Sequence, residues 1–557
     1  MIHLEEIISQ TNFMNKKHPK ALPYLFLSEM WERFGFYLML GIFFLYMTDT
    51  QKGGMAMDKK QASDIFGTFI ALVYLTPFIG GLLADRVLGY RLSITIGGIL
   101  MGIGYCGLAI PGMTAFYTSL FLICIGNGFF KPNISNIVGN VYKDADFKHL
   151  KDSGYNIFYM GINIGAFICN FFGSYLRNTF SWGAAFMAAG IGMFVGVIIF
   201  WLGNKHFKHA DVIKPTKPED MSVAKILGLT IVPMIVAGYI GWIIPGNIFG
   251  SDSTDAFILG ALPVAGYYVN IMLRSDAADR KPIAALLSVF AVAIIFWAIC
   301  KQNGTALTTW AESYTDREIA PAMVAPATAL GVVQEVVYAK DSVPLVDAQF
   351  KVARDANDKV IKTWDYPIYF KNIPKEKLPA EGQSVKLVST ELGQSINPFW
   401  VIFLTPVVVG FFAMLKRKNK EPGTPWKIFY GLFITALSTL VMVGATFACH
   451  NGLEKSSMLW LIGAYGVITV GELCLSPMAL SLVSKLAPPR LTALMMGGWF
   501  LSTSIGNKLS GVLASMWDGY EHKANFFLVN FVLALATSII ILLMIKWLNK
   551  ITKEHGV

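Results

Sequence analysis

Charged residues are scarce in this chain. They make up 15% of its 557 residues, and hydrophobic residues make up 54%, whereas about one quarter of a soluble domain is usually charged. The chain begins without a basic segment that leads into a short apolar core and a small-residue cleavage site, so we expect no removable signal peptide. This composition predicts an all-α polytopic membrane protein.

Motifs for catalysis and for metal binding are also lacking. All six cysteines lie inside apolar runs without metal-ligand or paired spacing, so we expect neither a metal site nor a disulfide. The glycine-rich segment 80–89 does not follow a strand, which argues against a nucleotide loop. A net charge of +10 is compatible with nucleic-acid binding, but the basic residues sit mostly in short loops between apolar runs. Membrane topology explains this placement better. We therefore expect no enzyme, no cofactor and no nucleic-acid partner.

About fourteen apolar runs are long enough to cross a bilayer as helices. They cover roughly residues 21–48, 61–86, 92–111, 114–140, 154–177, 181–203, 223–244, 256–273, 283–310, 395–415, 426–449, 457–486, 491–516 and 524–548. Basic residues follow the even-numbered runs, as Arg86 and Arg91 do after the second. Because cytoplasmic loops carry an excess of Lys and Arg, both termini are predicted to be cytoplasmic. Three basic residues depart from this pattern: Arg177, Lys455 and Lys523.

One connection, residues 311–393, is long and polar, and the predicted orientation places it outside the cell. Within it, residues 351–364 alternate apolar and polar side chains around Asp355–Asp358, which predicts a β-hairpin. We expect a small β-rich insertion. It is either a passive extracellular cap or the working part of a membrane enzyme or receptor.

The first apolar run contains three formal charges, at Glu29, Glu32 and Arg33. A charge at mid-membrane costs at least ~2.5 kcal/mol, so it is rarely kept without a task. Helical spacing puts these side chains and Tyr37 on roughly one face. That face must look into a bundle or a watery cavity. Two acids beside one base leave spare titratable capacity, which favours a functional site over a purely structural ion pair.

Four more ionisable residues lie deep inside other runs: Lys131, Lys301, Glu472 and Lys508. Intramembrane acids that can trade a proton against a basic partner are typical of proton relays and mark a substrate path. Lys508 lies nearer the outer end of its run. We interpret it as a side chain that snorkels to the membrane surface.

The surrounding residue types indicate a zwitterionic ligand. Donors for a carboxylate come from Arg33 and Lys131, and Glu472 is an anionic partner for an ammonium group. The remaining candidates offer hydroxyls, amides and apolar walls: Tyr37, Tyr74, Asn163, Asn397, Trp297 and Trp499. A short peptide has both charged poles and a variable side chain, so it fits this set. At the cytoplasmic end of the second run, Asp85, Arg86 and Arg91 can form a charge latch, which predicts a gate.

Several of these segments resemble motifs of one family. Residues 29–37 (EMWERFGFY) are similar to the ExxERFxYY signature of the proton-dependent oligopeptide transporters, a branch of the major facilitator superfamily. Residues 80–91 resemble the loop signature of that superfamily. Further matches follow in order at residues 126–133, 158–165, 394–398 and 471–477. The likeness covers nearly the whole chain.

The resemblance implies a fold and a division of the chain. It implies six-helix bundles at 1–203 and 283–557, with two extra transmembrane helices in the linker 204–282 and the insertion 311–393 inside the second bundle. The fold class is then a major facilitator fold with 14 transmembrane helices. We expect a functional monomer in the cell (inner) membrane.

The resemblance also implies roles for residues. Arg33, Tyr37 and Lys131 would hold the carboxylate end of the peptide, and Asn163, Asn397 and Glu472 its amino end. Tyr74, Trp297, Ser476 and Trp499 would complete the binding site. Proton coupling would involve Glu29, Glu32, Arg33, Lys131 and Glu472. The implied function is import of di- and tripeptides together with protons, and the alternative is a related transporter of nitrate or of a peptide-like drug.

Two positions depart from the family pattern. Phe36 stands where the signature usually has a tyrosine, so one hydroxyl near the ligand is missing. Lys301 stands where many members have a glutamate that can take a proton. This puts that position's share in coupling in doubt, and it adds a positive charge that needs a partner, such as Glu29, Glu32 or Glu472.

Overall fold

The computed structural model describes residues 18–144, 146–213, 222–488 and 491–555, which are mainly helical. Each predicted span coincides with a helix: α2 (Leu22–Thr48), α3 (Lys59–Leu83), α4 (Tyr90–Gly107), α5 (Met113–Val141), α6 (Lys151–Thr179), α7 (Trp182–Phe207), α8 (Val223–Ile243), α9 (Asp252–Arg274), α10 (Ala277–Cys300), α13 (Ile396–Arg417), α14 (Thr424–Ala448), α15 (Met458–Leu486), α16 (Thr492–Ser515) and α17 (Lys523–Glu554). Among the described residues, 10 helical segments are long and apolar enough to cross a membrane. The predicted cytoplasmic placement of both termini includes chain ends that lie outside the described residues.

The described chain divides into two compact units. The first comprises the residues up to Tyr37 together with Thr76–Cys169 and Phe186–Val223, and the second comprises Leu38–Leu75, Asn170–Ala185 and the residues from Ala224 onward. Helices α2, α3, α6 and α7 therefore contribute to both units. The division into 1–203, 204–282 and 283–557 stays a prediction.

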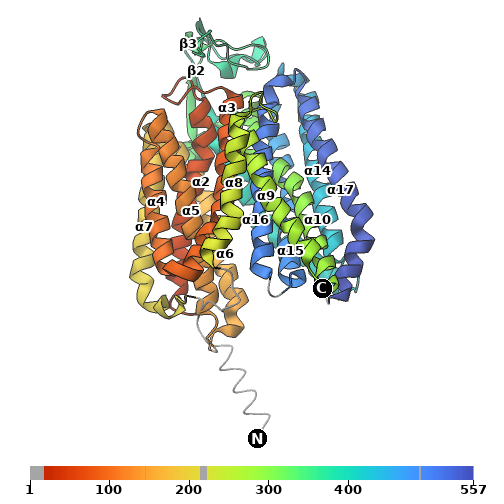
Figure 1. Cartoon of the computed structure of the whole chain (residues 1–557). Coiled ribbons are helices and arrows are strands. Elements are labelled where there is room, and N and C mark those ends of the chain that lie inside the picture. Colours follow the sequence, from red (N-terminus) through yellow and green to blue (C-terminus); the bar gives the residue numbers. More distant parts are fainter. Residues whose placement is uncertain (1–17, 145, 214–221, 489–490, 556–557) are drawn as a thin grey trace. The chain divides into compact units, whose positions relative to one another are not determined.

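In the first unit, glycines allow close contact between neighbouring helices (Figure 1). A Cβ atom on Gly97 of α4 would lie 2.6 Å from the carbonyl oxygen of Gly126 on α5, and a Cβ on Gly126 would lie 2.6 Å from the carbonyl oxygen of Gly97. A Cβ on Gly102 would lie 2.6 Å from the ring of Phe194 on α7. Small residues let helix backbones approach in membranes, where there is no hydrophobic drive between helices.

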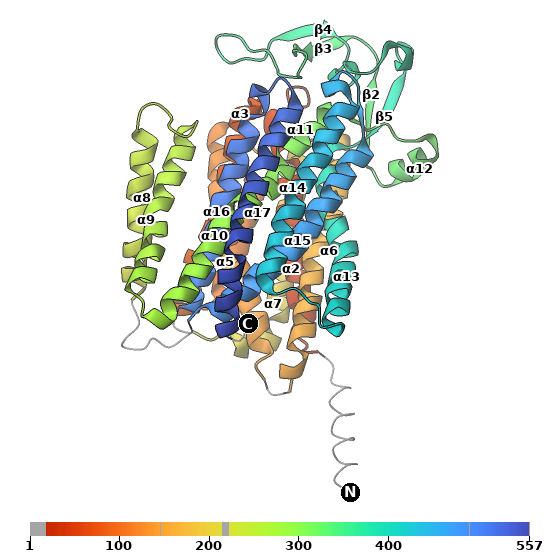
Figure 2. The same cartoon turned by 90° about the vertical axis from the view of Figure 1, so that its right-hand side faces the viewer.

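In the second unit, α10, α14, α15, α16 and α17 enclose an apolar core that includes Leu286, Phe290, Leu432, Leu475 and Met495. The antiparallel pair α8 and α9 stands at one side of this group (Figure 2). The pair contacts the group through α9, which packs against α10 and α16.

The predicted span 283–310 is interrupted. Helix α10 ends at Cys300, residues Lys301–Gly304 form a 3₁₀ turn, and a short helix, α11 (Ala306–Ser313), continues the segment. A Cβ on Gly304 would lie 2.2 Å from the ring of Phe66 on α3, so the turn packs directly against that ring. Lys301 therefore sits where the helix changes its winding, as is common at functional hinges.

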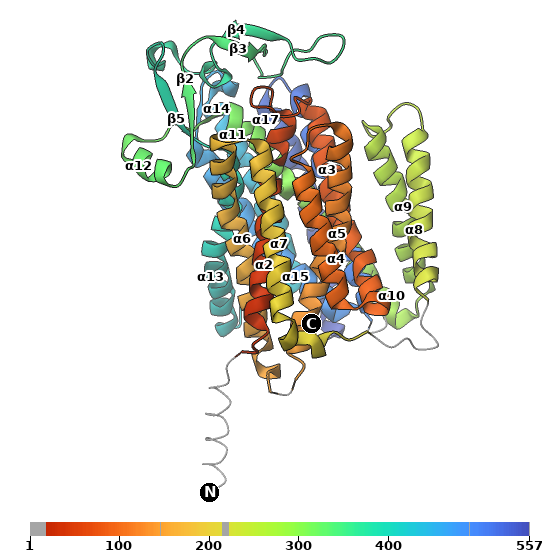
Figure 3. The ribbon, with the colours of Figure 1, turned by 90° about the vertical axis from the view of Figure 1, so that its left-hand side faces the viewer.

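At one end of the second unit, the insertion 311–393 carries every strand of the described residues except β6 (Figure 3). Strand β2 (Val333–Val337) pairs antiparallel with β5 (Ser384–Val388), and β3 (Asp341–Pro344) pairs antiparallel with β4 (Lys362–Asp365). Strand β1 (Thr315–Asp316) pairs in parallel with β6 (Ser456–Ser457), which ties the insertion to the loop before α15. The insertion also contains the short helix α12 (Pro321–Ala329).

The predicted hairpin at 351–364 is confirmed in its turn. Asp355 donates its backbone N–H to the carbonyl oxygen of Lys359, and Arg354 forms an antiparallel bridge with Val360. Beyond the turn the pairing differs from a simple hairpin within 351–364, because Trp364 pairs with Ser342 of β3. A second turn, in which the N–H of Asp347 bonds the carbonyl oxygen of Lys351, brings the β3 segment alongside.

Candidate functional site

The charged residues of α2 form a buried cluster in the first unit. Glu29, Glu32 and Arg33 are at most 2% exposed. The guanidinium of Arg33 binds both carboxylate oxygens of Glu32, one through Nη2 at 2.5 Å and the other through Nε. Its Nε also lies 3.4 Å from Oε1 of Glu29, four residues earlier, so the two side chains share one helix face as the spacing predicts. Oε2 of Glu29 is buried and has no hydrogen-bond partner among the described residues.

Aromatic rings cover the guanidinium of Arg33. Its Cζ lies 5.2 Å from the ring centroid of Phe36 and 6.0 Å from that of Tyr37. A cation over an aromatic face is attracted by the ring quadrupole. Phe36, where the signature usually has tyrosine, therefore still contacts the cation, although it supplies no hydroxyl.

Two other candidates of the first unit lie on α5 and α6. Lys131 of α5 is half-buried and close enough to Glu29 for its charge to act on that carboxylate. Asn163 of α6 donates its side-chain amide to the carbonyl oxygen of Tyr159, one turn earlier on the same helix, at 3.2 Å. In this structure the side-chain amide of Asn163 therefore bonds to the backbone of its own helix.

The predicted gate forms different pairs from the latch expected within 85–91. The hydroxyl of Tyr90 donates to Oδ1 of Asp85 at 2.7 Å. Arg91 lies 3.8 Å from Asp211, whose carboxylate also accepts the backbone N–H of Tyr90 at 2.7 Å. Asp211 follows α7, so it connects the loop after α3 to a distant part of the sequence. Arg86 belongs to the π-helical turn Ala84–Leu88, which lies between α3 and α4.

In the second unit, the structure brings Asn397 of α13 and Glu472 of α15 together. The Asn397 amide donates to Oε2 of Glu472 at 3.3 Å and to the hydroxyl of Thr469 at 3.0 Å. Ser476 lies one turn after Glu472, on the same helix face. A carboxylate held by an amide, beside hydroxyls, is suited to bind an ammonium group.

Tryptophans of α10 and α16 form an apolar wall in the same unit. The rings of Trp297 and Trp499 meet edge to face with centroids 6.4 Å apart, and both side chains are buried. The amine of Lys301 lies 5.0 Å from the ring centroid of Trp297. Tyr74 of α3 is half-buried in this unit.

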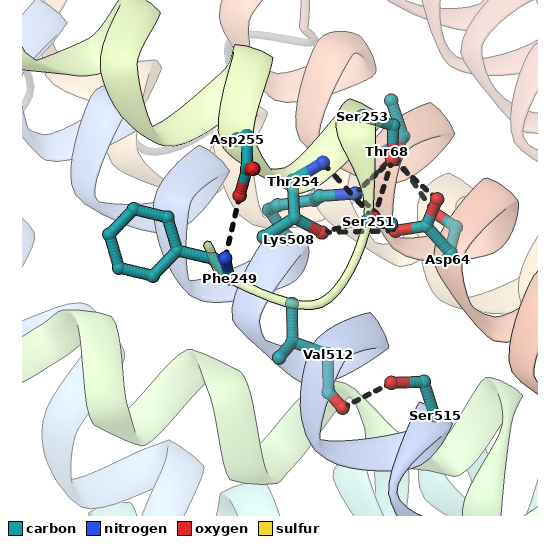
Figure 4. Close-up of polar contacts among 10 residues, drawn as sticks. All are labelled: Asp64, Thr68, Phe249, Ser251, Ser253, Thr254, Asp255, Lys508, Val512 and Ser515. Atoms are coloured by element: carbon teal, nitrogen blue, oxygen red, sulfur yellow. Dashed lines mark hydrogen bonds and ion pairs between the residues drawn. The ribbon is translucent and has the colours of Figure 1, made fainter. Parts of the chain in front are cut away.

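Lys508 does not snorkel, so that interpretation is wrong. Its side chain is 1% exposed, and its amine lies 2.6 Å from Oδ1 of Asp64 on α3 (Figure 4). Pairing with a carboxylate inside the protein removes the need to reach the membrane surface. Asp64 was overlooked because it lies only a few residues inside its helix. An acid within a span is the signal that could have found it.

Metal binding has no support in the part of the chain that is described. Within residues 18–144, 146–213, 222–488 and 491–555, no group of three His, Cys, Asp or Glu side chains is placed to hold a metal ion.

Known proteins similar to this chain are transporters. A curated relative, the uncharacterized transporter YclF of Bacillus subtilis (strain 168), is 31% identical over 94% of this chain and 94% of its own length. A di-/tripeptide transporter of Lactococcus lactis subsp. lactis is 28% identical over 96% of each chain. A crystal structure of the peptide transporter POT in complex with sulfate superposes with a TM-score of 0.75, at 29% identity and 96% coverage of each chain.

The family assignment rests on the chain as a whole. The sequence model of the POT family matches residues 91–337 and 384–528, which is more than half of the chain. The matched regions include α10, α15 and α16, which carry Trp297, Glu472 and Trp499. This chain therefore belongs to the POT family of membrane transporters.

Proposed function

We propose that this protein is a proton-coupled symporter that imports di- and tripeptides by alternating access. Its curated relatives include proteins named di-/tripeptide transporter and peptide transporter. The observation that carries the proposal is the buried cluster on α2. Two carboxylates there share one guanidinium, and Oε2 of Glu29 accepts no hydrogen bond from any described residue. A carboxylate with spare capacity inside a span is suited to take up a proton.

Each pole of a peptide has a complementary residue set. We assign the carboxylate end to Arg33, Tyr37 and Lys131, and the amino end to Asn163, Asn397 and Glu472. Tyr74, Trp297, Ser476 and Trp499 line the side-chain positions, and Asp85, Arg86 and Arg91 act at the cytoplasmic gate. Glu29, Glu32, Arg33, Lys131 and Glu472 carry the coupling. The hydrogen bond between Asn397 and Glu472 supports the assignment of the amino end.

The finer assignments belong to the same proposal. The protein acts as a monomer in the cell (inner) membrane, with both termini in the cytoplasm, and it is not an enzyme. Two six-helix bundles, residues 1–203 and 283–557, move against each other around a midplane site, and residues 204–282 supply the extra pair of helices.

Uptake of a labelled dipeptide into cells that express the protein tests this proposal. We expect accumulation that requires an inward proton gradient and collapses with a protonophore. Free di- and tripeptides should compete, whereas N-acetylated dipeptides should compete poorly because they lack the ammonium that Glu472 binds. Competition by nitrate, or equal competition by acetylated and free dipeptides, would favour the alternative of another anion.

A further inference from the structure

The proposed transport mechanism assigns no task to the hairpin of α8 and α9, yet the start of α9 is bound tightly to two other helices. Ser251 is the N-cap of α9, and its hydroxyl accepts the N–H of Thr254 at 3.2 Å. The carboxylate of Asp255 accepts the N–H groups of Ile248 and Phe249 at 2.8 and 2.7 Å. These bonds fix the turn that leads into α9 (Figure 4).

The turn presents three hydroxyls to Asp64 of α3. Oδ1 of Asp64 accepts from Ser251 at 2.9 Å and from Thr254 at 3.1 Å, and Oδ2 accepts from Ser253. The positive end of the α9 dipole also lies at this carboxylate. Asp64 is thus held as an anion by the first turn of another helix.

Lys508 of α16 completes the cluster. Its amine donates to Asp64 at 2.6 Å, to the hydroxyl of Thr68 at 2.7 Å and to that of Ser253 at 2.9 Å. An ammonium group has three hydrogens to donate, so all three are used. One ion pair, in which Lys508 is buried and Asp64 half-buried, therefore connects α3, α9 and α16.

Close contact between α3 and α16 continues from the ion pair toward the middle of α3. A Cβ on Gly67 would lie 2.8 Å from the Cα of Gly511. Further along, the hydroxyl of Ser504 donates to the carbonyl oxygen of Ala71 at 2.6 Å. The two helices touch along at least two turns of α3, and the ion pair closes the end of this contact where α3 begins.

We propose that Asp64, Lys508 and the α9 hydroxyls form a latch through which the α8–α9 hairpin holds the extracellular ends of α3 and α16 together. The inference rests on the proposed alternating access, in which α3 and α16 belong to different moving bundles. Opening to the outside must separate Asp64 from Lys508 and expose both charges to water. The hairpin stabilises the closed state, because its three hydroxyls satisfy the carboxylate only while α3 and α16 are in contact.

Labelling of a cysteine at position 504 tests the latch. The six native cysteines are replaced by alanine and Ser504→Cys is introduced as a reporter. Ser504 is buried between α3 and α16, so a membrane-impermeant maleimide added from outside reaches it only when these helices part. We expect slow labelling with the latch intact. Labelling should become about tenfold faster with Asp64→Asn or Lys508→Gln, a typical size for coupling between sites.

A second variant tests the hairpin by itself. Ser251→Ala, Ser253→Ala and Thr254→Val together remove the hydroxyls but keep the ion pair, and they too should speed labelling. Ser515→Ala is the matched control, because the Ser515 hydroxyl donates only to the carbonyl oxygen of Val512 on its own helix. Unchanged labelling in the triple variant would overturn the role of the hairpin. Unchanged labelling in a folded Asp64→Asn variant, verified by gel filtration, would overturn the latch.

These outcomes are independent of the substrate. Maleimide labelling requires no peptide, so faster labelling in the variants supports the latch even if uptake assays fail to show peptide transport. Conversely, the parent protein could show normal peptide uptake while all variants label at the same rate. That result would support the proposed function and contradict the latch.

Discussion

The side-chain amide of Asn397 and the carboxylate of Glu472, on α13 and α15, are hydrogen-bonded at 3.3 Å. Asn397 also donates to Thr469 at 3.0 Å, so its amide is fixed on two sides. An amide in this position orients the Glu472 carboxylate without neutralising it. On the proposed function, this carboxylate is the partner of the ligand's ammonium group.

Replacing Glu472 is therefore expected to weaken peptide binding. Glu472→Gln keeps the shape and the contact with Asn397 but removes the charge that pairs with the ligand's ammonium. Loss of one partner of a buried charge pair costs ~2–5 kcal/mol, which corresponds to roughly 30-fold or more in affinity. Competition of labelled dipeptide uptake by unlabelled dipeptide measures this. Glu554→Gln, near the end of α17, is the control, and equal affinities in both variants would exclude Glu472 from the site.

Lys131 is expected to be essential for coupling. Its charge acts on Glu29, so Lys131→Ala leaves the acids of α2 without this counter-charge. We predict that the variant loses proton-driven accumulation but keeps some counterflow exchange, because exchange requires no net proton movement. Lys143→Ala, an exposed lysine just beyond α5, serves as the control. Normal accumulation by Lys131→Ala against a peptide gradient would contradict the assignment.

Hydropathy alone predicts the long apolar helices, and local spacing is sufficient for the α2 cluster. The side chains of Glu29 and Arg33 are four residues apart on one helix, so their contact follows from helical geometry. The pair Asn397 and Glu472 needed the resemblance, because the residues are 75 positions apart in the sequence.

The ion-pair partners of Arg177 and Lys508 could not be predicted from the sequence, because each lies far away along the chain. Arg177 departs from the positive-inside pattern, and it lies 3.1 Å from Glu391, which is fully buried. Lys508 finds Asp64 more than four hundred residues earlier. Neither partner can be chosen from composition, since many acids are available and only the tertiary fold selects one. The break after Cys300 has a local signal instead, because the polar residues Lys301–Thr305 (KQNGT) interrupt the apolar run at that point.

Lys455, another exception to the pattern, is expected to be an unusually reactive amine. Burial, reinforced by the charge of Arg317, lowers the pKa of Lys455 to about 7. Its amine donates to the carbonyl oxygen of Ser313 at 2.9 Å and lies 4.4 Å from the ring centroid of Tyr369. With this depressed pKa the amine is protonated below pH 7 and neutral above it.

Amine-reactive acetylation followed by mass spectrometry measures this titration. The rate at Lys455 should rise as the pH passes through about 7 and then level off. A short lysine peptide, with an ordinary pKa of about 10.4, should continue to gain reactivity above pH 9. A rate at Lys455 that follows the peptide would contradict the depressed pKa.

The insertion is expected to be dispensable for transport. Val333 and Val388 are paired across β2 and β5, and the N–H of Ser389 donates to the carbonyl oxygen of Val332 at 3.1 Å. Two glycines can therefore replace residues 333–388 with little strain. We expect the shortened protein to keep proton-driven dipeptide uptake, measured at matched membrane expression. Loss of uptake with intact folding would favour the rival in which the insertion is the working part.

Lys301 offers the most demanding prediction, because the family resemblance leads us to expect a glutamate that can take a proton at this position. It lies at the end of α10, with its amine 5.0 Å from the ring centroid of Trp297. We predict that its amine also balances a carboxylate, within about 4–6 Å, among Glu29, Glu32 and Glu472. Coupling then depends on those acids rather than on position 301.

On this hypothesis, Lys301→Gln removes the counter-charge and leaves one acid uncompensated. That acid holds its proton to higher pH, so the pH profile of dipeptide uptake should shift upward. Lys301→Arg keeps the charge and should keep the profile, which makes it the matched control. An unshifted profile in Lys301→Gln, measured at equal expression across the same pH series, would show that Lys301 balances no coupling acid.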